Sequence, residues 1–460
     1  MHDDRSCCCP FSSIYRNTDK KVDRKFMENV IIVLLSCILC FTIIRGVRGK
    51  ICKFIIYTYC GYWLISLFSS TFNPYGLFEI KTSTYTLLCL NVIAFSLGFC
   101  LCKNKKNRNQ KIDIKENLLY AISHIENNVL FVLLFLVSLL ICSILFVISQ
   151  MVSSIDGTGE LRWNLNEVLF GGNEFLHIYF SLILGPIFQI CNILLGLNLF
   201  AKEKRSMIRI LLYVVFSFMY ASISGGRLLY VVIFLEIIFV YIAINSQNKL
   251  FQKKYIIPFC VASIVLYSLL CFTTARKREN VDFSWDIVSE EADGINRSLV
   301  TYSTAPFRLF DYALENDYLG KAGGYKYGRS TFQSLDDITN SLCGILKIDY
   351  TPVFPSTTKF LGEELIVVSD QLHPYNYAYT SLMMHYYDFG IIGCIAFPFF
   401  FGFFLRKMVF RFEKRANLAN LCIIAYLYYG AIYSIFTWFL VQMYSAIYII
   451  IMFYFSKKIH

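Results

Sequence analysis

The sequence predicts an all-α polytopic membrane protein. Three observations predict it: an apolar composition, apolar blocks of helical length, and the placement of the basic residues. Of the 460 residues, 56% are hydrophobic and only 16% are charged, and the mean hydropathy is +0.53. Soluble domains average about 25% charged residues. Soluble enzymes, nucleic-acid binders and secreted disulfide scaffolds are therefore the first classes to be excluded.

The apolar residues form about eleven blocks, each long enough to cross about 30 Å of hydrocarbon as a helix. The expected spans are Val30–Ile44, Phe54–Phe72, Tyr85–Cys102, Val129–Ser149, Phe175–Phe200, Met207–Ser222, Leu228–Ile244, Tyr255–Thr274, Tyr379–Leu405, Leu418–Tyr433 and Phe436–Phe455.

The Lys and Arg residues cluster in alternate breaks between these blocks. The basic breaks are Arg45–Lys53, Lys103–Lys115, Lys202–Arg209, Lys249–Lys254, Arg406–Arg415 and the tail Lys457–Lys458. Cytoplasmic loops collect Lys and Arg, so these breaks are expected inside and the intervening ones outside. The net charge of +11 is thus explained by membrane topology, and no nucleic-acid partner is expected.

Five segments follow from this topology. Residues 1–28 form an N-terminal extension, expected to be untranslated if synthesis starts at Met27, which directly precedes the first span. Residues 29–274 hold transmembrane helices 1–8, residues 275–378 form a large outer loop, residues 379–456 hold helices 9–11, and residues 457–460 form a cytoplasmic tail.

The outer loop is predicted to fold as a small cap on the membrane. It is aromatic and acidic, and we expect short helices at Ser284–Glu291 and Asp336–Leu346, with turns at Pro306, Pro352, Pro355 and Pro374. Of the 17 cysteines it holds only Cys343, so no disulfide is expected within it. No Cys/His spacing resembles a zinc site, and we expect no metal and no cofactor.

A Gly-Gly-Arg turn, with Gly225, Gly226 and Arg227, joins the sixth and seventh spans at the outer boundary. Arg276 and Arg278 follow the eighth span at the same depth, so these guanidinium groups can converge on one anionic group. The alternative is that Arg227 closes a tight turn and that the arginines anchor to lipid headgroups.

Three residues near or within the membrane could carry chemistry. Glu236 lies deep in the seventh span and should face the interior of the bundle, in either a structural or a proton-transfer role. Asp388 would lie just inside the membrane, with Gly390 and Gly393 available for close helix packing. His385 is a candidate general base by residue type, although a single His flanked by tyrosines is more often structural. The paired acids Glu290/Glu291, Glu363/Glu364 and Asp336/Asp337 are interpreted as solvated helix faces.

In layout and motifs the chain resembles the O-antigen and capsule repeat-unit polymerases of the Wzy type. Three elements carry the resemblance, in order along the chain. These are Ser224–Arg227; Phe310-Asp311 with Tyr327–Phe332; and Asn376–Thr380 followed by Asp388-Phe389-Gly390 and Gly393.

The resemblance implies a metal-independent glycosyltransferase of GT-C-like architecture in the bacterial inner membrane, with its active site facing the periplasm. Its donor and acceptor would be undecaprenyl-diphosphate-linked oligosaccharides. Membrane lipids, a chain-length regulator and a flippase are further expected partners. Fixed guanidinium groups would stabilise the diphosphate leaving group.

Site roles follow from the turn, the outer loop and these motifs together. The predicted catalytic residues are Asp311, Asp388 and His385, and the predicted substrate-binding residues are Arg227, Arg276, Arg278, Gly225, Gly226, Arg297, Arg308, Tyr379 and Asn376.

Two other functions remain open at this point. An O-antigen ligase would share the donor and the arginine chemistry, but an outer-loop His essential for transfer would favour it. A flippase or other transporter would need polar groups spread through the spans, and here only Glu236 and Asp388 are charged.

Overall fold

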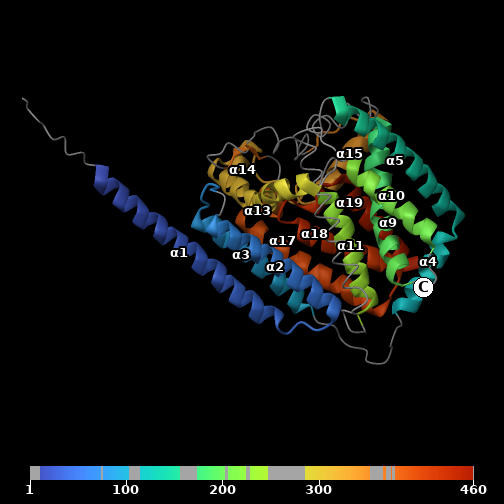
Figure 1. Ribbon diagram of the computed structural model, residues 1–460, viewed down its shortest axis with the longest axis horizontal. Coiled ribbons are helices and arrows are strands. Elements are labelled where there is room, and N and C mark those ends of the chain that lie inside the picture. The colour runs from blue at the N-terminus through green and yellow to red at the C-terminus, as the bar shows by residue number, and fades with distance from the viewer. Residues whose placement is uncertain are drawn as a thin grey trace, which may run out of the picture.

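The computed structural model describes residues 11–73, 76–102, 114–155, 174–201, 206–223, 228–246, 285–352, 366–368, 374–375 and 379–458. Within these ranges the chain is overwhelmingly helical (Figure 1). The first half contains α1 (Phe11–Ile44), α2 (Lys50–Phe72), α3 (Thr82–Leu101), α4 (Ile114–Glu126), α5 (Val129–Ile155), α8 (Glu174–Tyr179), η1 (Phe180–Leu184), α9 (Gly185–Phe200), α10 (Met207–Ile223) and α11 (Leu228–Ile244). The second half contains α13 (Trp285–Glu315), α14 (Tyr318–Lys321), α15 (Gln333–Leu346), β1 (Ile366–Val367), β2 (Pro374–Tyr375), α17 (Thr380–Lys414), α18 (Leu418–Tyr433), η2 (Phe439–Val441) and α19 (Met443–Lys458).

Six helices in the described residues are long and apolar enough to cross a membrane. They are Lys25–Ile44, Lys50–Phe72, Thr82–Leu101, Val129–Met151, Phe180–Phe200 and Thr380–Lys414. Four further apolar helices are shorter: Met207–Ile223, Leu229–Ile244, Leu418–Tyr433 and Met443–Lys457. The expected span Tyr255–Thr274 lies outside the described residues. The chain is therefore a membrane-embedded helical protein, and ten of the eleven expected spans coincide with apolar helices.

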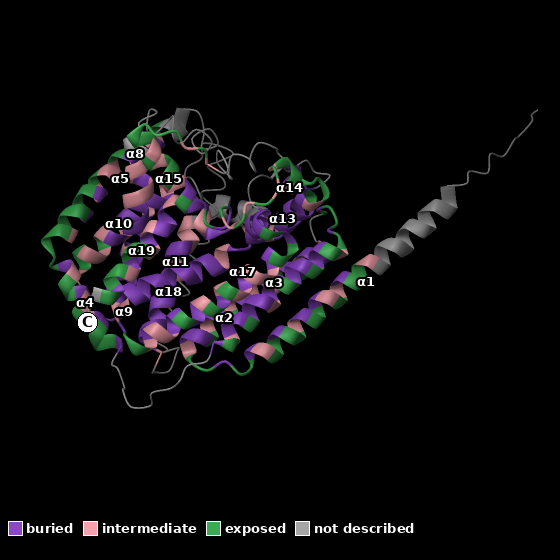
Figure 2. Ribbon diagram, turned by 180° about the vertical axis from the view of Figure 1, so that it is seen from behind, coloured by how far each residue is buried: buried purple, intermediate pink, exposed green. Residues whose placement is uncertain are grey.

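The apolar surface is distributed as a membrane protein requires. α18 is buried along nearly its whole length at the centre of the bundle, whereas α5 and the second half of α1 expose leucines and isoleucines at the periphery (Figure 2). Exposed apolar side chains on outer helices can face lipid, which is as apolar as they are.

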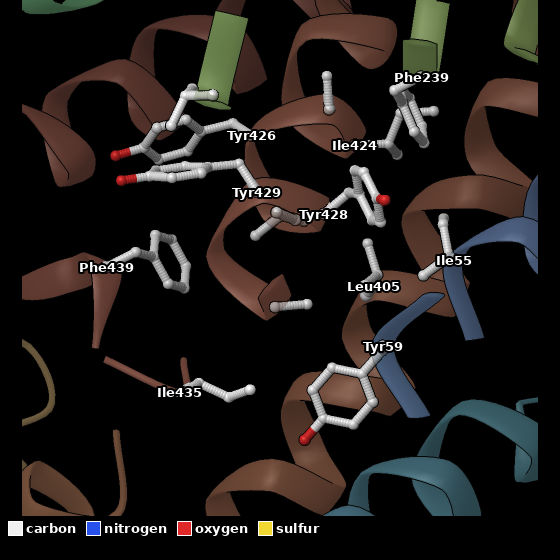
Figure 3. Packing of buried hydrophobic residues seen from close by; sticks show 14 of the residues in the cluster. Ile55, Tyr59, Phe239, Leu405, Ile424, Tyr426, Tyr428, Tyr429, Ile435 and Phe439 are labelled. Carbon is white, nitrogen blue, oxygen red and sulfur yellow. The ribbon is translucent and has the colours of Figure 1, made fainter. Parts of the chain in front are cut away.

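The centre of the bundle is packed with large aromatic side chains. Phe54 of α2, Phe239 of α11 and Tyr428 of α18 meet there, and the Phe54 ring centroid is 5.4 Å from that of Tyr428. The Phe239 and Tyr428 rings stack with centroids 5.2 Å apart (Figure 3). Stacked aromatic pairs contribute about 0.5–1.5 kcal/mol beyond their buried area.

The closest helix contact joins α3 to α17. A Cβ added at Gly98 would collide with the backbone carbonyl of Phe399, and one added at Gly402 would collide with that of Phe95. Each helix thus offers a glycine where the other presents backbone, an arrangement typical of tightly packed transmembrane helices.

The two ends of the bundle differ in charge. At one end, which we call the basic end, Arg406 donates to the Arg48 carbonyl at 3.3 Å, and Arg411 donates to Ser456 Oγ at 2.7 Å. Three of the predicted cytoplasmic segments therefore lie together.

The opposite end, which we call the α13 end, holds α13, α14 and the start of α17 (Figure 1). Lys25 of α1 reaches Glu79 there at 3.3 Å, so α1 starts on the side expected to be outside.

Two local expectations from the sequence were wrong. Pro306 lies inside α13 rather than in a turn, because buried residues on both sides of it, Ala305 and Phe307 among them, hold one continuous helix. Pro374 belongs to β2, which pairs antiparallel with β1. The helix expected at Asp336–Leu346 is confirmed as α15.

The short amphipathic helix α4 was missed. Its buried stripe runs through Ile114, Leu118 and Ile122 to Glu126, which accepts hydrogen bonds from Arg209 and, at 2.7 Å, from Asn198. It lies mostly between the predicted basic break Lys103–Lys115 and the span that begins at Val129, and its apolar residues are too few to form a span.

Candidate functional site

Asp388 joins two segments that are far apart in the sequence. Its Oδ1 accepts the Ser330 N–H at 2.9 Å and its Oδ2 accepts the Thr331 N–H at 2.7 Å. The carboxylate is fully buried. Hydrogen bonds to a charged acceptor are about twice as strong as neutral ones, and an unpaired buried carboxylate is costly. Asp388 therefore fixes the segment 325–332 against α17.

His385, one turn earlier on α17, holds the same segment. Its Nδ1 lies 3.1 Å from Thr331 Oγ1, and its ring stacks on Phe397 with centroids 4.8 Å apart. The Trp438 ring meets it edge-on, and the Trp438 indole N–H donates to the Thr331 carbonyl at 2.8 Å. This enclosure favours a structural hydrogen-bonding role for His385. Its predicted role as a general base stays a prediction.

α17 breaks directly after Asp388. Phe389 leaves helical geometry and Gly390 adopts φ +60°, a conformation that L side chains rarely adopt. The Tyr325 hydroxyl lies 3.0 Å from where a Gly390 Cβ would be, and a Cβ on Gly393 would meet the His385 carbonyl. The two glycines thus allow the break in α17, and Gly390 leaves space for the Tyr325 side chain. We had expected them to lie against a neighbouring helix.

Arg308 on α13 clamps the end of α2. It donates to the Ser70 hydroxyl at 2.9 Å, the Phe78 carbonyl at 2.7 Å, the Thr304 carbonyl at 3.1 Å and Asn73 Oδ1 at 3.3 Å. Burial lowers the pKa of Arg308 to about 10, which leaves it cationic at neutral pH. With these donors committed inside the protein, Arg308 holds α13 on α2, and its predicted role in substrate binding stays a prediction.

Asp311, one turn further along α13, caps the start of α3. It accepts the Thr84 hydroxyl and, at 3.2 Å, the Lys81 N–H. A carboxylate at a helix N-terminus is favoured by the helix dipole. Burial raises the pKa of Asp311, and the two hydrogen bonds oppose that shift. Its placement favours a positioning role, and its predicted role as a base stays a prediction.

Tyr379 is buried where α17 begins, with its ring centroid 6.1 Å from that of Tyr318. The next residue, Thr380, adopts φ +67°, which is rare for a β-branched residue. Its N–H donates to the Phe436 carbonyl at 3.0 Å, so the segment between α18 and η2 holds this geometry. The start of α17 is thus fixed by residues over 50 positions later in the chain.

Arg329 is a half-exposed cation at this end. Its guanidinium lies 2.7 Å from Asp336 Oδ1, and the Tyr350 hydroxyl donates to the same oxygen at 2.6 Å. Asp336 raises the pKa of Arg329. Asp336 is buried, so its interpretation as part of a solvated face was wrong: the carboxylate turns inward to meet Arg329.

Several predicted residues lie outside the described part of the chain. These are Gly225, Gly226, Arg227, Arg276, Arg278 and Asn376, together with the acidic pair Glu363/Glu364. Arg297 lies within α13, but its side chain is not among those described, and the same holds for Glu290 and Glu291.

Glu236 faces the interior of the bundle, as predicted. Its Oε2 accepts the Asn192 amide at 2.8 Å, and the Ser217 hydroxyl donates to Asn192 Oδ1 at 2.7 Å. The amide of Gln189 also faces the carboxylate and can donate to it. This network links α9, α10 and α11, none of which carries a segment gathered around Asp388.

Sequence reasoning missed the exposed aromatic residues beside the break in α17. Tyr327 and Phe389 were part of the motifs and Tyr325 was not, and nothing in their spacing shows that they share one surface. Among the described residues, no group of three or more His, Cys, Asp or Glu side chains lies together as metal ligands would.

Comparison of the chain with protein-family models, with curated proteins and with solved structures finds no match.

Proposed function

We propose that this protein is a membrane-embedded glycosyltransferase that polymerises undecaprenyl-diphosphate-linked oligosaccharide repeat units on the periplasmic side of a bacterial inner membrane. The observation that carries the proposal is the pairing of Asp388 with the Ser330 and Thr331 amides. It unites two of the segments on which the resemblance to the Wzy-type polymerases rests.

A third such segment lies at the same end of the bundle. Phe310, next to Asp311, has its ring centroid 6.3 Å from that of Tyr386, which lies two residues before Asp388. Motifs that matched by chance would have no reason to meet in space. Their convergence at the α13 end, opposite the basic end, supports a site that works on one face of the membrane.

The reaction transfers a glycan between two lipid carriers. An acceptor sugar hydroxyl forms a bond to the anomeric carbon of the donor glycan, the bond from that carbon to the diphosphate breaks, and the lipid diphosphate leaves. The hydroxyl proton passes to a base. The leaving charge needs cations that are fixed before the reaction starts, and in this proposal Arg227, Arg276 and Arg278 supply them.

The test is deletion of the gene, followed by gel analysis of the surface polysaccharide. A band of single repeat units supports the polymerase, unattached polymer points to a ligase, and loss of all exported units points to a flippase. In the deletion strain, Arg227→Ala should leave at most one repeat unit. Arg227→Lys should restore partial activity, because a lysine lacks the bidentate geometry. Arg45→Ala, at the basic end, is the matched control.

One observation favours transport as the second candidate. Glu236, Asn192 and Ser217 form a buried polar chain inside the helix bundle, and ionisable groups within the membrane often mark transport paths. Flippase activity would require Glu236→Gln to abolish export, whereas a polymerase should tolerate it.

A further inference from the structure

Three exposed aromatic side chains form a continuous surface at the break in α17, which we call the aromatic platform. It consists of Tyr325, Tyr327 and Phe389. The ring centroids of Tyr325 and Tyr327 are 6.4 Å apart, and those of Tyr327 and Phe389 are 6.3 Å apart. Their exposed fractions are 48%, 75% and 43%, so the rings leave the protein core yet stay next to one another.

The platform rests on a rigid base. Lys326 donates its N–H to the Tyr387 carbonyl at 2.8 Å, and Asp388 holds the backbone a few residues further on. Tyr325 lies against Gly390, where a Cβ would come within 3.0 Å of the tyrosine hydroxyl. The rings are therefore fixed before any ligand arrives, which lowers the entropic cost of binding.

The backbone at the centre of the platform is strained. Tyr327 adopts φ +52°, and the conformation is unfavourable for a residue with a side chain. Such strain persists only where the surrounding structure imposes it, and it is concentrated at ligand sites. Here it holds out an aromatic ring that is three-quarters exposed and contributes little to the core.

The platform lies where a lipid-linked molecule would meet the membrane surface. Beyond the break, α17 continues for about 24 residues, or about 36 Å, which is enough to cross the hydrocarbon by itself. Ile391 and Ile392, directly after Phe389 and Gly390, are largely exposed and begin a lipid-facing surface. Aromatic rings are favoured at this interface, and a glycan held here would keep its lipid carrier alongside α17.

We infer that the aromatic platform binds a sugar ring of the lipid-linked glycan by stacking, an assignment that rests on the proposed function. A pyranose ring presents a face of C–H groups, which are attracted to the negative face of an aromatic ring. A staggered row of rings suits successive sugars of a glycan better than it suits a compact anion. Both neighbouring cations are already engaged: Arg329 pairs with Asp336, and the Lys326 ammonium donates to the Ala322 carbonyl.

The test combines binding with polymer formation. The probe is the repeat-unit oligosaccharide released from the strain's own surface polysaccharide, titrated against the purified full-length protein. Tyr327→Ala should weaken binding about 10-fold and shorten the polymer ladder, whereas Tyr327→Phe should stay within about twofold of wild type. Tyr120→Ala removes an equally exposed tyrosine, at 75%, from α4 and should change neither measurement.

Tyr327→Gly separates ligand binding from folding. Glycine relieves the strained φ, so this variant should be at least as stable to heat as wild type while binding the oligosaccharide as weakly as Tyr327→Ala. Wild-type binding by a Tyr325→Ala/Tyr327→Ala double variant would overturn the inference, and so would a lost ladder with unchanged oligosaccharide affinity. If instead the gene deletion leaves the ladder intact, the proposed function itself fails.

Discussion

Two buried carboxylates in this protein, Glu236 and Asp388, accept hydrogen bonds from different kinds of donor, and the difference separates two regions of the molecule. Glu236 of α11 is held by side-chain amides of one neighbouring helix, α9. Asp388 is held by backbone amides of a segment that carries exposed aromatic rings. The first arrangement joins helices to one another. The second fixes a surface at the end of the bundle, and this is the region to which we assign function.

The largest expected effect is the loss of the Asp388 carboxylate. Asp388→Ala leaves the buried Ser330 and Thr331 N–H groups without an acceptor, at a cost of about 2–5 kcal/mol. Hydrogen exchange should therefore speed up in peptides covering residues 325–332. Glu236→Gln keeps an acceptor for Asn192, so exchange in α9 and α11 should be nearly unchanged. Unaltered exchange at residues 325–332 in Asp388→Ala would show that the Asp388 carboxylate does not fix this segment.

Substitution of Arg308 tests how strongly this side chain attaches α13 to the end of α2. Arg308→Ala removes the donor to the Phe78 carbonyl and leaves the Ser70 hydroxyl with only the Tyr85 hydroxyl as a donor, and we expect a loss of about 2–4 kcal/mol in the free energy of unfolding in detergent. Arg308→Lys should recover part of it. Lys81→Ala is the control, because its ion pair with Glu315 is exposed on both sides and contributes little to stability. Equal losses for the two alanine variants would show that Arg308 is no clamp.

Helix packing gives a smaller effect. Gly98→Ala forces a methyl group against the Phe399 carbonyl and should cost about 1–3 kcal/mol, measured as a lower melting temperature. Gly61 on α2 has no atom within 4 Å of its Cβ position, so Gly61→Ala should be neutral or slightly stabilising. If both variants melt alike, α3 and α17 are not packed through Gly98.

The smallest effect is a pH dependence at α15. Burial, together with the neighbouring Asp336, raises the pKa of Asp337 to about 6 in the folded protein. The fold binds this proton more tightly than the unfolded chain does, so stability rises as the pH falls from about 7 to about 4 and falls as the pH rises through 6. Asp337→Asn should raise the melting temperature by about 2–4 °C at pH 7.5 and leave it unchanged at pH 4. Asp349→Asn, at an exposed carboxylate, controls for the loss of one negative charge. An equally large rise in its melting temperature at pH 7.5 would show that the effect does not come from the raised pKa of Asp337.

The sequence predicted what depends on local composition. Ten apolar helices, six of them long enough to cross a membrane, follow from runs of apolar residues, and the basic end follows from runs of basic ones. The helix α15 and the inward-facing Glu236 were predicted as well, the latter from the cost of a charge in lipid. The count of about eleven spans and the GT-C-like architecture stay predictions.

The contacts that build the site could not be predicted in this way. Asp388 meets amides 57 and 58 residues earlier in the chain, and hydrophobic periodicity carries no information about such pairs. The sequence marked Asp311, His385 and Asp388 as polar residues in apolar surroundings, but their hydrogen-bond partners decide what they do. The platform was missed because exposed tyrosines look alike in a sequence whether or not they share a surface.

The most direct test of the account is polymer formation by the purified protein supplied with lipid-linked repeat units from its own strain. The wild-type protein and Glu236→Gln should both extend chains. Asp388→Asn replaces one of the two acceptor oxygens by an NH2 group, so one backbone N–H loses its acceptor. This variant should therefore lose at least about 10-fold in rate. Full activity in Asp388→Asn together with an inactive Glu236→Gln would move the working site to the middle of the bundle.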